Sequence, residues 1–236
     1  MPILKEKDRQ AVAERLESLA GPVKMLLFTD SPSPLILPGQ ASPPCPYCKE
    51  AAALVQELAE LSPLLSAEVV ELKKQPEKAQ AFGVDKVPAL VLLAGDGSDT
   101  RVRFYGLPSG YEFATLLEDL LDVGQRASRL SQETKEFLAT LKAPVHLQVF
   151  VTPTCPYCPQ AVRLAHQMAL ESPWVQGDMI EAMEFQELAA RYEVMGVPLT
   201  VINESQYIEG AVPEEHLVQA LKEILADNTG EVPAKG

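Results

Sequence analysis

The residues best suited to chemistry are four cysteines, which the chain of 236 residues carries as two identical tetrapeptides. They are Cys45-Pro46-Tyr47-Cys48 and Cys155-Pro156-Tyr157-Cys158. Two thiols separated by two residues can close a local disulfide or hold a metal ion together. Cytosolic proteins keep few structural disulfides, so cysteines that occur only as such pairs indicate redox or metal chemistry.

A structural zinc site with four cysteine ligands is the alternative to redox chemistry. Zinc sites of this type usually place their two pairs about 15 to 20 residues apart. Here Cys48 and Cys155 are 107 residues apart, and the three histidines show no ligand spacing. His166, eight residues after Cys158, is expected at the surface of a helix. The spacing therefore favours redox chemistry and no bound metal.

An internal repeat relates the two tetrapeptides. Their offset of 110 residues also relates Val87-Pro88 to Val197-Pro198, and each proline falls 40 residues after the second cysteine of its half. The first half has 12 extra residues within 30–44, a stretch rich in proline. Matches of this kind indicate two units of similar fold.

Apolar periodicity predicts the same order of elements in both units. In the first, we expect helices over 8–20, 48–61, 77–82 and 109–121, and strands over 23–29, 68–72, 89–94 and 101–105. In the second, we expect helices over 132–141, 158–171, 185–192 and 213–226, and strands over 145–151, 179–183, 199–203 and 206–208. The expected domains are 1–122 and 123–226, followed by a disordered tail over 227–236.

Each cysteine pair thus lies where a strand gives way to a helix. The helix N-terminus carries unpaired amides and a partial positive charge, which favour a thiolate over a thiol. The first cysteines, Cys45 and Cys155, lie on the preceding turn and are the expected nucleophiles. The second cysteines, Cys48 and Cys158, are expected to resolve the mixed disulfide. The expected supporting residues of the motif are Pro46, Tyr47, Pro156 and Tyr157.

This element order, with C-x-x-C after the first strand and Val-Pro before a hairpin, resembles the thioredoxin fold. Two linked units with Cys-Pro-Tyr-Cys resemble the protein disulfide oxidoreductases of hyperthermophilic archaea and bacteria, as do the stretches 104–108 and 149–159. The resemblance implies an α/β fold of two tandem thioredoxin-like domains, each a mixed central sheet flanked by helices. It also implies cis bonds at Pro88 and Pro198. Such bonds would aim the backbone of Val87 and Val197 along a groove where an extended substrate could pair.

The function implied is a cytoplasmic thiol–disulfide oxidoreductase that reduces, forms or isomerises protein disulfides. Its expected partners are proteins with thiols or disulfides and a flavoprotein electron donor similar to thioredoxin reductase. No cofactor is expected beyond the redox-active disulfides. The alternative is an electron-transfer module between a flavoprotein reductase and a peroxidase. That role resembles the paired thioredoxin-like units at the front of some peroxide-reductase flavoproteins, which keep one active pair where this chain keeps two.

Composition argues against two other classes of partner, nucleic acids and membranes. A formal charge of −13, from 20 basic and 33 acidic residues, argues against a nucleic-acid partner. No stretch approaches the roughly 20 apolar residues of a membrane span, and no apolar run follows the charged N-terminus. We therefore expect no membrane partner. The low number of asparagines (2) and the high number of prolines (20) are typical of a thermophile.

Two questions stay open in the sequence. Thioredoxins carry a buried acid six residues before the first cysteine, but the corresponding residues here are Leu27 and Val149, so no proton-transfer group is assigned. Glu71 and Glu181 fall on the second strands, and exposed carboxylates are favoured there over buried acids. The extra stretch 30–44 either covers the first pair or is a surface excursion without effect.

Overall fold

A computed structural model describes residues 3–30 and 45–229. In this part of the chain the helices are α1 Glu6–Leu16, α2 Cys48–Leu61, α3 Pro76–Ala81, α4 Tyr111–Gln125, α5 Gln132–Ala139, α6 Cys158–Glu171, α7 Gln186–Arg191 and α8 Glu214–Thr229. The strands are β1 Val23–Thr29, β2 Leu65–Glu71, β3 Ala89–Ala94, β4 Asp99–Tyr105, β5 Val145–Val151, β6 Val175–Glu181, β7 Leu199–Ile202 and β8 Gln206–Glu209. The proline-rich stretch 31–44, with its predicted cover over the first pair, lies outside the described residues.

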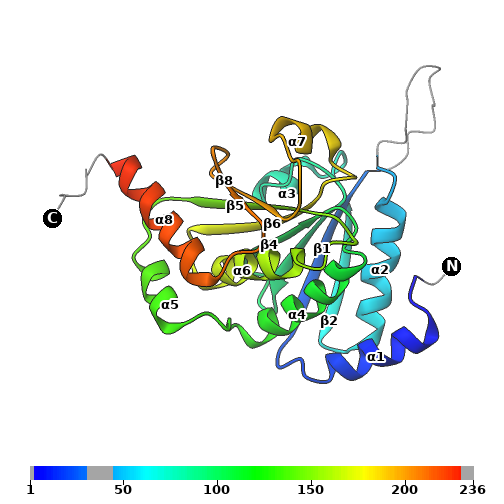
Figure 1. The fold of residues 1–236 in the computed structure, drawn as a ribbon. Helices are drawn as coiled ribbons and strands as arrows, with labels where there is room; N and C mark the ends of the chain where they lie inside the picture. The colour runs from blue at the N-terminus through cyan, green and yellow to red at the C-terminus, as the bar shows by residue number, and fades with distance from the viewer. Residues whose placement is uncertain (1–2, 31–44, 230–236) are drawn as a thin grey trace, which may run out of the picture.

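The eight strands form one continuous sheet in the order β2-β1-β3-β4-β6-β5-β7-β8, which crosses the middle of the molecule (Figure 1). In the first unit, β1 pairs with β2 in parallel and with β3 antiparallel, and β3 pairs with β4 antiparallel. The second unit repeats this arrangement with β5, β6, β7 and β8. Two units of the expected mixed-sheet topology are therefore confirmed.

The join between the units is a pairing that the repeat does not predict. Strand β4 of the first unit pairs in parallel with β6 of the second, from Val102 opposite Gly177 to Tyr105 opposite Ile180. Each of these strands would be an edge of its own sheet, with unpaired backbone groups. Their pairing satisfies both edges and gives the two units a common sheet.

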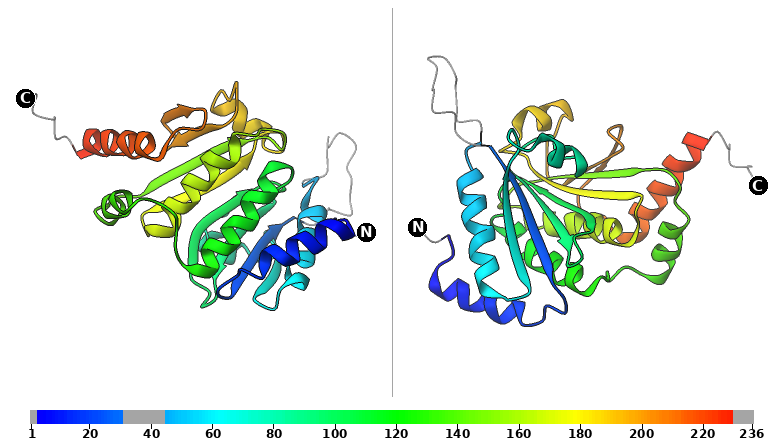
Figure 2. Two further views of the ribbon diagram at one scale, coloured as in Figure 1. Left: turned by 60° about the horizontal axis from the view of Figure 1, so that its bottom comes forward. Right: turned by 180° about the vertical axis from the view of Figure 1, so that it is seen from behind.

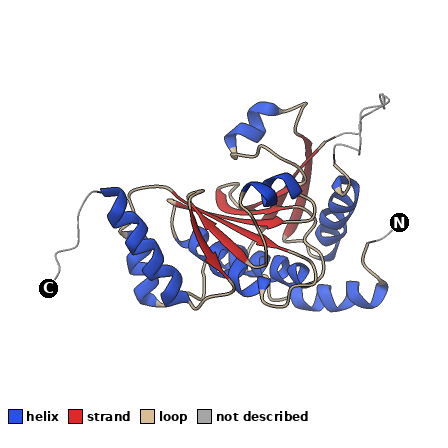
Figure 3. Ribbon diagram, turned by 45° about the horizontal axis from the view of Figure 1, so that its top comes forward, coloured by secondary structure: helices blue, strands red, loops and turns tan. Residues whose placement is uncertain are grey.

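Helices cover both faces of this sheet, and the strands alternate between two cores. Met25 and Leu27 belong to the larger core, together with residues of α2, α4, α6 and α8. Leu26 and Phe28 belong to the smaller core, beneath α3 and α7. This alternation follows from the two-residue period of a strand. Figure 2 shows α4 and α6 side by side on one face, and Figure 3 shows α3 and α7 on the opposite side of the sheet.

Local sequence explains the elements that open each unit. Strand β3, ALVLLA, is buried along its whole length because helices cover both of its faces. Helix α2 buries Ala51, Leu54, Val55 and Leu58, which recur every three or four residues on one face. It ends at Leu61, because the next residue, Ser62, has an extended backbone. Together, β1 and α2 place the first tetrapeptide at one end of the sheet.

Several boundaries differ from the sequence-based expectation. Strands β2 and β6 begin at Leu65 and Val175, earlier than expected, because β1 and β5 supply pairing partners to polar residues that lack the apolar pattern of a strand. Helix α4 continues to Gln125, so the expected boundary between 122 and 123 falls within its last turn. Helix α8 continues to Thr229, so the expected tail begins inside a helix, and 230–236 lie outside the described residues.

The prediction that His166 lies at the surface is wrong. Its side chain is 1% exposed, and its Nδ1 atom lies 2.6 Å from Oδ2 of Asp119. The reason is tertiary, because α4 of the first unit packs over the face of α6 that an isolated unit would expose to water. Arg163, also on α6, forms ion pairs with Asp119 and Asp122 of α4. In the described part of the chain, no helix is both long and apolar enough to cross a membrane.

Candidate functional site

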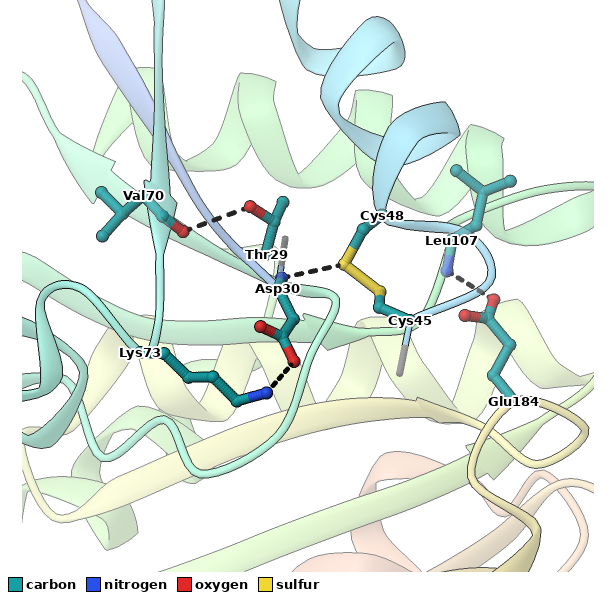
Figure 4. The surroundings of a disulfide bond; sticks show 8 residues. All are labelled: Thr29, Asp30, Cys45, Cys48, Val70, Lys73, Leu107 and Glu184. Carbon is teal, nitrogen blue, oxygen red and sulfur yellow. Dashed lines mark hydrogen bonds and ion pairs between the residues drawn. A yellow bond between two sulfur atoms is a disulfide. The ribbon is translucent and has the colours of Figure 1, made fainter. Parts of the chain in front are cut away.

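The first cysteine pair lies between β1 and α2 and forms a disulfide, Cys45–Cys48. Cys48 is the first residue of α2 and is 5% exposed, whereas Cys45 is partly exposed. The backbone amide of Asp30, just after β1, donates to Cys48 Sγ at 3.3 Å. The Asp30 carboxylate forms an ion pair of 2.7 Å with Lys73, on the Cys48 side of the disulfide (Figure 4). The strand end therefore brings an amide to the second sulfur, and its charged pair lies on that side of the disulfide.

The second pair, Cys155–Cys158, forms a disulfide between β5 and α6. The backbone amide of Cys158, in the first turn of α6, donates to Cys155 Sγ at 3.1 Å. This is the contact by which a helix N-terminus stabilises negative charge on a sulfur. Cys155 is 7% exposed and Cys158 is 0% exposed. In both pairs the first cysteine is thus the more accessible one, although Cys155 is less open than its place on a turn suggests.

The two Val-Pro bonds, at Pro88 and Pro198, are both cis. The carbonyl oxygen of Val197 lies 3.7 Å from Cys155 Sγ, so the backbone before Pro198 adjoins the second disulfide. A cavity of about 360 Å³ is lined by Val197, Pro198 and Met195, and the Met195 side chain is 96% exposed. Val197 therefore contacts the second disulfide through its carbonyl oxygen and also lines this cavity.

The tyrosines of the two tetrapeptides point outward. Tyr47 is 44% exposed and Tyr157 is 68% exposed. Exposed aromatic side chains beside a reactive group offer apolar contact area to a docking protein. Their exposure is consistent with a supporting role at the surface, as distinct from a role in the core.

Each site also receives a segment from the other unit. At the second site, α4 of the first unit begins beside Pro153, whose carbonyl accepts a hydrogen bond of 3.1 Å from the Tyr111 amide. The next residue, Glu112, is 1% exposed, and burial raises the pKa of its carboxyl to about 7. Sequence reasoning missed Glu112, because an acid in the first turn of a helix ordinarily faces solvent and favours the helix dipole.

At the first site, the contribution of the second unit comes from the segment after β6. The Glu184 carboxylate accepts a hydrogen bond of 2.7 Å from the Leu107 amide, just after β4 (Figure 4). The amide of Gly106 donates at 3.0 Å to the carbonyl of Pro88. Sequence reasoning also missed Glu184, since only the pairing of β4 with β6 brings its segment to the first site.

The acids that the sequence did single out behave differently from each other. Glu71 is partly exposed and forms an ion pair with Lys74. Glu181 is 4% exposed, so the expectation of an exposed carboxylate is wrong there. Its oxygens accept hydrogen bonds from the amides of Met183 and Glu184, and burial raises its pKa. The difference arises because β6 is an inner strand of the joined sheet, whereas β2 is an edge.

Comparison with known proteins fits this geometry. The thioredoxin domain family model matches residues 41–118 and 145–225, one match for each unit. A protein disulfide oxidoreductase from Aeropyrum pernix is 30% identical and superposes with a TM-score of 0.83 over 100% of this chain and 98% of its own. The chain belongs to the two-domain, thioredoxin-like protein disulfide oxidoreductase family. It carries two C-x-x-C sites, one in each thioredoxin domain.

Other relatives of this oxidoreductase are named as peroxide reductases or dehydrogenases. The N-terminal domain of the alkylhydroperoxide reductase AhpF from Enterococcus faecalis is 26% identical, with a TM-score of 0.81 over 92% of this chain and 99% of that one. An alkyl hydroperoxide reductase component from Staphylococcus aureus is 28% identical over 173 residues, which are 73% of this chain and 31% of that protein. A Bacillus subtilis protein named NADH dehydrogenase is 28% identical over 170 residues, 72% of this chain and 31% of its own. The chain thus spans about a third of the curated relatives it matches.

Proposed function

We propose that this protein is a cytoplasmic enzyme that reduces, forms or isomerises disulfides of other proteins at two dithiol sites. The observation that carries the proposal is the contact at the second pair, where the helix amide of Cys158 donates to Cys155 Sγ, which also lies 3.7 Å from the Val197 carbonyl. A stabilised thiolate next to a strand-like groove is what exchange with an extended polypeptide requires.

The reductive half of the reaction runs through two exchanges. The thiolate of Cys155 attacks one sulfur of the substrate disulfide and forms a mixed disulfide, and the other substrate sulfur leaves and takes a proton. The thiolate of Cys158, formed by loss of its proton, then attacks Cys155 Sγ and releases the second substrate sulfur. The substrate gains two electrons and two protons, and the enzyme pair becomes a disulfide. Cys45 and Cys48 take the same roles at the first site, and the reverse sequence forms disulfides.

The substrate groove at each site is formed by the backbone before the cis-proline, with Val87 and Pro88 at the first and Val197 and Pro198 at the second. An extended substrate segment pairs there with the valine backbone, in the manner of an added strand. Hydrogen bonds between main chains do not depend on which side chains the substrate carries. We therefore propose that the groove accepts many polypeptides with thiols or disulfides. A flavoprotein similar to thioredoxin reductase is the proposed electron donor.

The active-site assignment is tested by serine variants of the two pairs. Cys45→Ser and Cys155→Ser should each abolish exchange at their own site and leave the other pair competent, because a helix-stabilised thiolate starts each reaction. Insulin reduction with dithiothreitol measures this, with the double variant as the inactive control. In Cys48→Ser and Cys158→Ser proteins, a mixed disulfide should accumulate on Cys45 and Cys155. Trapping of the mixed disulfide on the second cysteines would overturn the assignment.

Metal analysis of the purified protein tests the alternative. Zinc bound at about one per chain, with unreactive thiols, would favour a structural metal site.

A second candidate function is electron transfer between a flavoprotein reductase and a peroxidase. The likeness to the N-terminal domain of an alkylhydroperoxide reductase favours it. Two experiments separate the functions: refolding of a scrambled disulfide protein, and NADH-dependent peroxide reduction by a flavoprotein and peroxidase lacking their own thioredoxin-like module. Refolding without peroxide reduction supports the disulfide oxidoreductase. Peroxide reduction without refolding supports the electron carrier.

A further inference from the structure

Glu184 belongs to the second unit but lies at the redox pair of the first. It follows β6, on the Cys45 side of the first disulfide (Figure 4). One carboxylate oxygen, Oε1, accepts a hydrogen bond of 2.7 Å from the amide of Leu107. Because the adjacent Gly106 amide is bonded to the Pro88 carbonyl, this contact fixes the carboxylate beside the groove of the first site.

A shared cavity connects Glu184 with the first tetrapeptide. Its volume is about 750 Å³, and its walls include Pro46 and Tyr47 from the first unit. The opposite wall comes from the segment after β6 and from α7 of the second unit. The substrate sulfur that leaves when Cys45 attacks the other one would therefore face a space that Glu184 lines.

The second carboxylate oxygen of Glu184 is available for a proton. Oε2 is shielded from solvent and has no hydrogen-bond partner among the described residues. Burial, together with the charges of Glu181 on β6 and Glu50 on α2, raises the pKa of Glu184 to about 7, against the lowering effect of the Leu107 amide. The other charged residues that line the cavity are Asp85, Lys86, Glu187 and Arg191.

We propose that Glu184 is the proton-transfer group of the Cys45–Cys48 pair, supplied to the first site by the second unit. This role rests on the exchange chemistry proposed above. Glu184 takes the proton that the Cys45 thiol loses when it becomes a thiolate. When the substrate S–S bond breaks, the leaving sulfur receives the electron pair and then this proton. The second proton of the reduced substrate comes from Cys48, so protons and electrons balance over the cycle.

The repeat places no acid at the position of the first unit that matches Glu184. The residue 110 positions before Glu184 is Lys74, whose side chain is 70% exposed and paired with Glu71. The second pair therefore has no acid at the corresponding position. The buried acid near the second site is Glu112, at the start of α4, so the two sites adjoin acids of different elements although their tetrapeptides are identical.

The first test is the pH profile of Cys45 alkylation by iodoacetamide, measured in reduced protein with Cys155 and Cys158 replaced by serine. With Glu184 present, two neighbouring groups titrate together, so the profile should be broader than a one-proton curve. Glu184→Gln keeps an oxygen for the Leu107 amide but cannot ionise, so its profile should narrow to one proton and move to lower pH. Glu187→Gln, an exposed residue of the same cavity, is the control and should leave the profile unchanged.

The second test compares two neutral substrates that differ in their need for a proton. Hydroxyethyl disulfide releases a basic alkyl thiolate, whereas dipyridyl disulfide releases a weakly basic aromatic one. Glu184→Gln should slow exchange with the first roughly tenfold, the lower end of general-acid effects, and leave the second within about twofold.

Superimposable alkylation profiles for the parent and Glu184→Gln proteins would overturn the proposal. Equal slowing with both substrates, or an equal change at Cys155 in a protein with Cys45 and Cys48 replaced by serine, would also overturn it, since either result indicates a general structural effect. Neither test needs a protein substrate. Failure of insulin reduction would therefore contradict the proposed function without deciding the role of Glu184.

Discussion

At the scale of single residues, identical tetrapeptides meet different surroundings. Asp30 and Lys73 form an ion pair of 2.7 Å beside Cys48. The corresponding residues of the second unit are Thr152 and Met183, which carry no charge. Charges near a sulfur change the balance between thiol, thiolate and disulfide. The two pairs are therefore expected to differ in reduction potential, which titration of each pair in single-site variants can measure.

Glu112 provides a prediction about stability and pH. Its carboxyl has a pKa of about 7 in the folded protein, raised by burial from an ordinary value of 4.5. The unfolded chain thus ionises more readily, so the free energy of unfolding should fall between about pH 4.5 and pH 7, and stay level above. The loss of unfolding free energy amounts to about 3 kcal/mol, because each unit of difference between the folded and unfolded pKa corresponds to about 1.36 kcal/mol. Glu112→Gln cannot ionise and should lack this loss.

Urea unfolding at about pH 5 and pH 8 checks the Glu112 prediction. The stability of Glu112→Gln relative to the parent protein should increase between these two pH values. Glu133→Gln, an exposed acid in the first turn of α5, should show no such change. A pH dependence of Glu112→Gln equal to that of the parent would contradict a buried, titrating carboxyl.

At the scale of elements, the residue after β4, Gly106, contacts two other parts of the sheet. It closes the hairpin of its own unit through the Gly106 amide and the Pro88 carbonyl, and it lies against β6 of the other unit. Gly106 has a φ of 99°, and a Cβ atom there would lie 2.6 Å from Cβ of Glu181. Gly210 directly follows β8 and has a φ of 77°, but nothing lies within 4 Å of its Cβ position. The joined sheet thus adds a steric demand to one of two equivalent glycines.

We expect Gly106→Ala to destabilise the protein more than Gly210→Ala. Both substitutions carry the cost of a positive φ, of the order of 1 kcal/mol. Gly106→Ala adds a backbone shift or crowding in a packed region, which typically costs about 1–3 kcal/mol more. The midpoints of urea unfolding for the two variants measure the difference. Equal midpoints would show that β6 shifts to accommodate the added methyl group without a loss of stability.

At the scale of the whole molecule, the contacts that join the two units include the β4–β6 pairing and the packing of α4 on α6. The second contains a buried ionic cluster in which Arg163 of α6 contacts Asp119 and Asp122 of α4. The side chains of the two aspartates are 2% and 5% exposed. Charges removed from water in this way depend strongly on their partners. We therefore expect the two units to unfold together in a single transition.

Replacing Arg163 tests this coupling. Arg163→Met leaves two buried carboxylates without their cation and should cost about 3–5 kcal/mol of stability. Arg129→Met removes an ion pair to Glu118 from a side chain that is 68% exposed, and should cost less than about 1 kcal/mol. Calorimetry of both variants gives the changes in Tm. If Arg163→Met unfolds in two steps, this cluster is the main link between the units. A loss as small as that of Arg129→Met would show that this cluster contributes little to the link between the units.

The local pattern of the chain determined the elements of each unit and their order. Strands β1, β3 and β5 and helices α2 and α6 have the expected limits, because continuous apolar runs and helical spacing act over a few residues. The tetrapeptides and the internal repeat identified the two disulfides and the two cis-prolines. The joined sheet was decided by tertiary structure, since backbone pairing at an edge leaves no periodic signal in either strand. The packing of the two units buries His166, Glu112 and Glu181, and the joined sheet places Glu184 at the site of the other unit. Burial and charge depend on neighbours distant in the chain, so the chemistry of these acids appeared only once the two units were packed together.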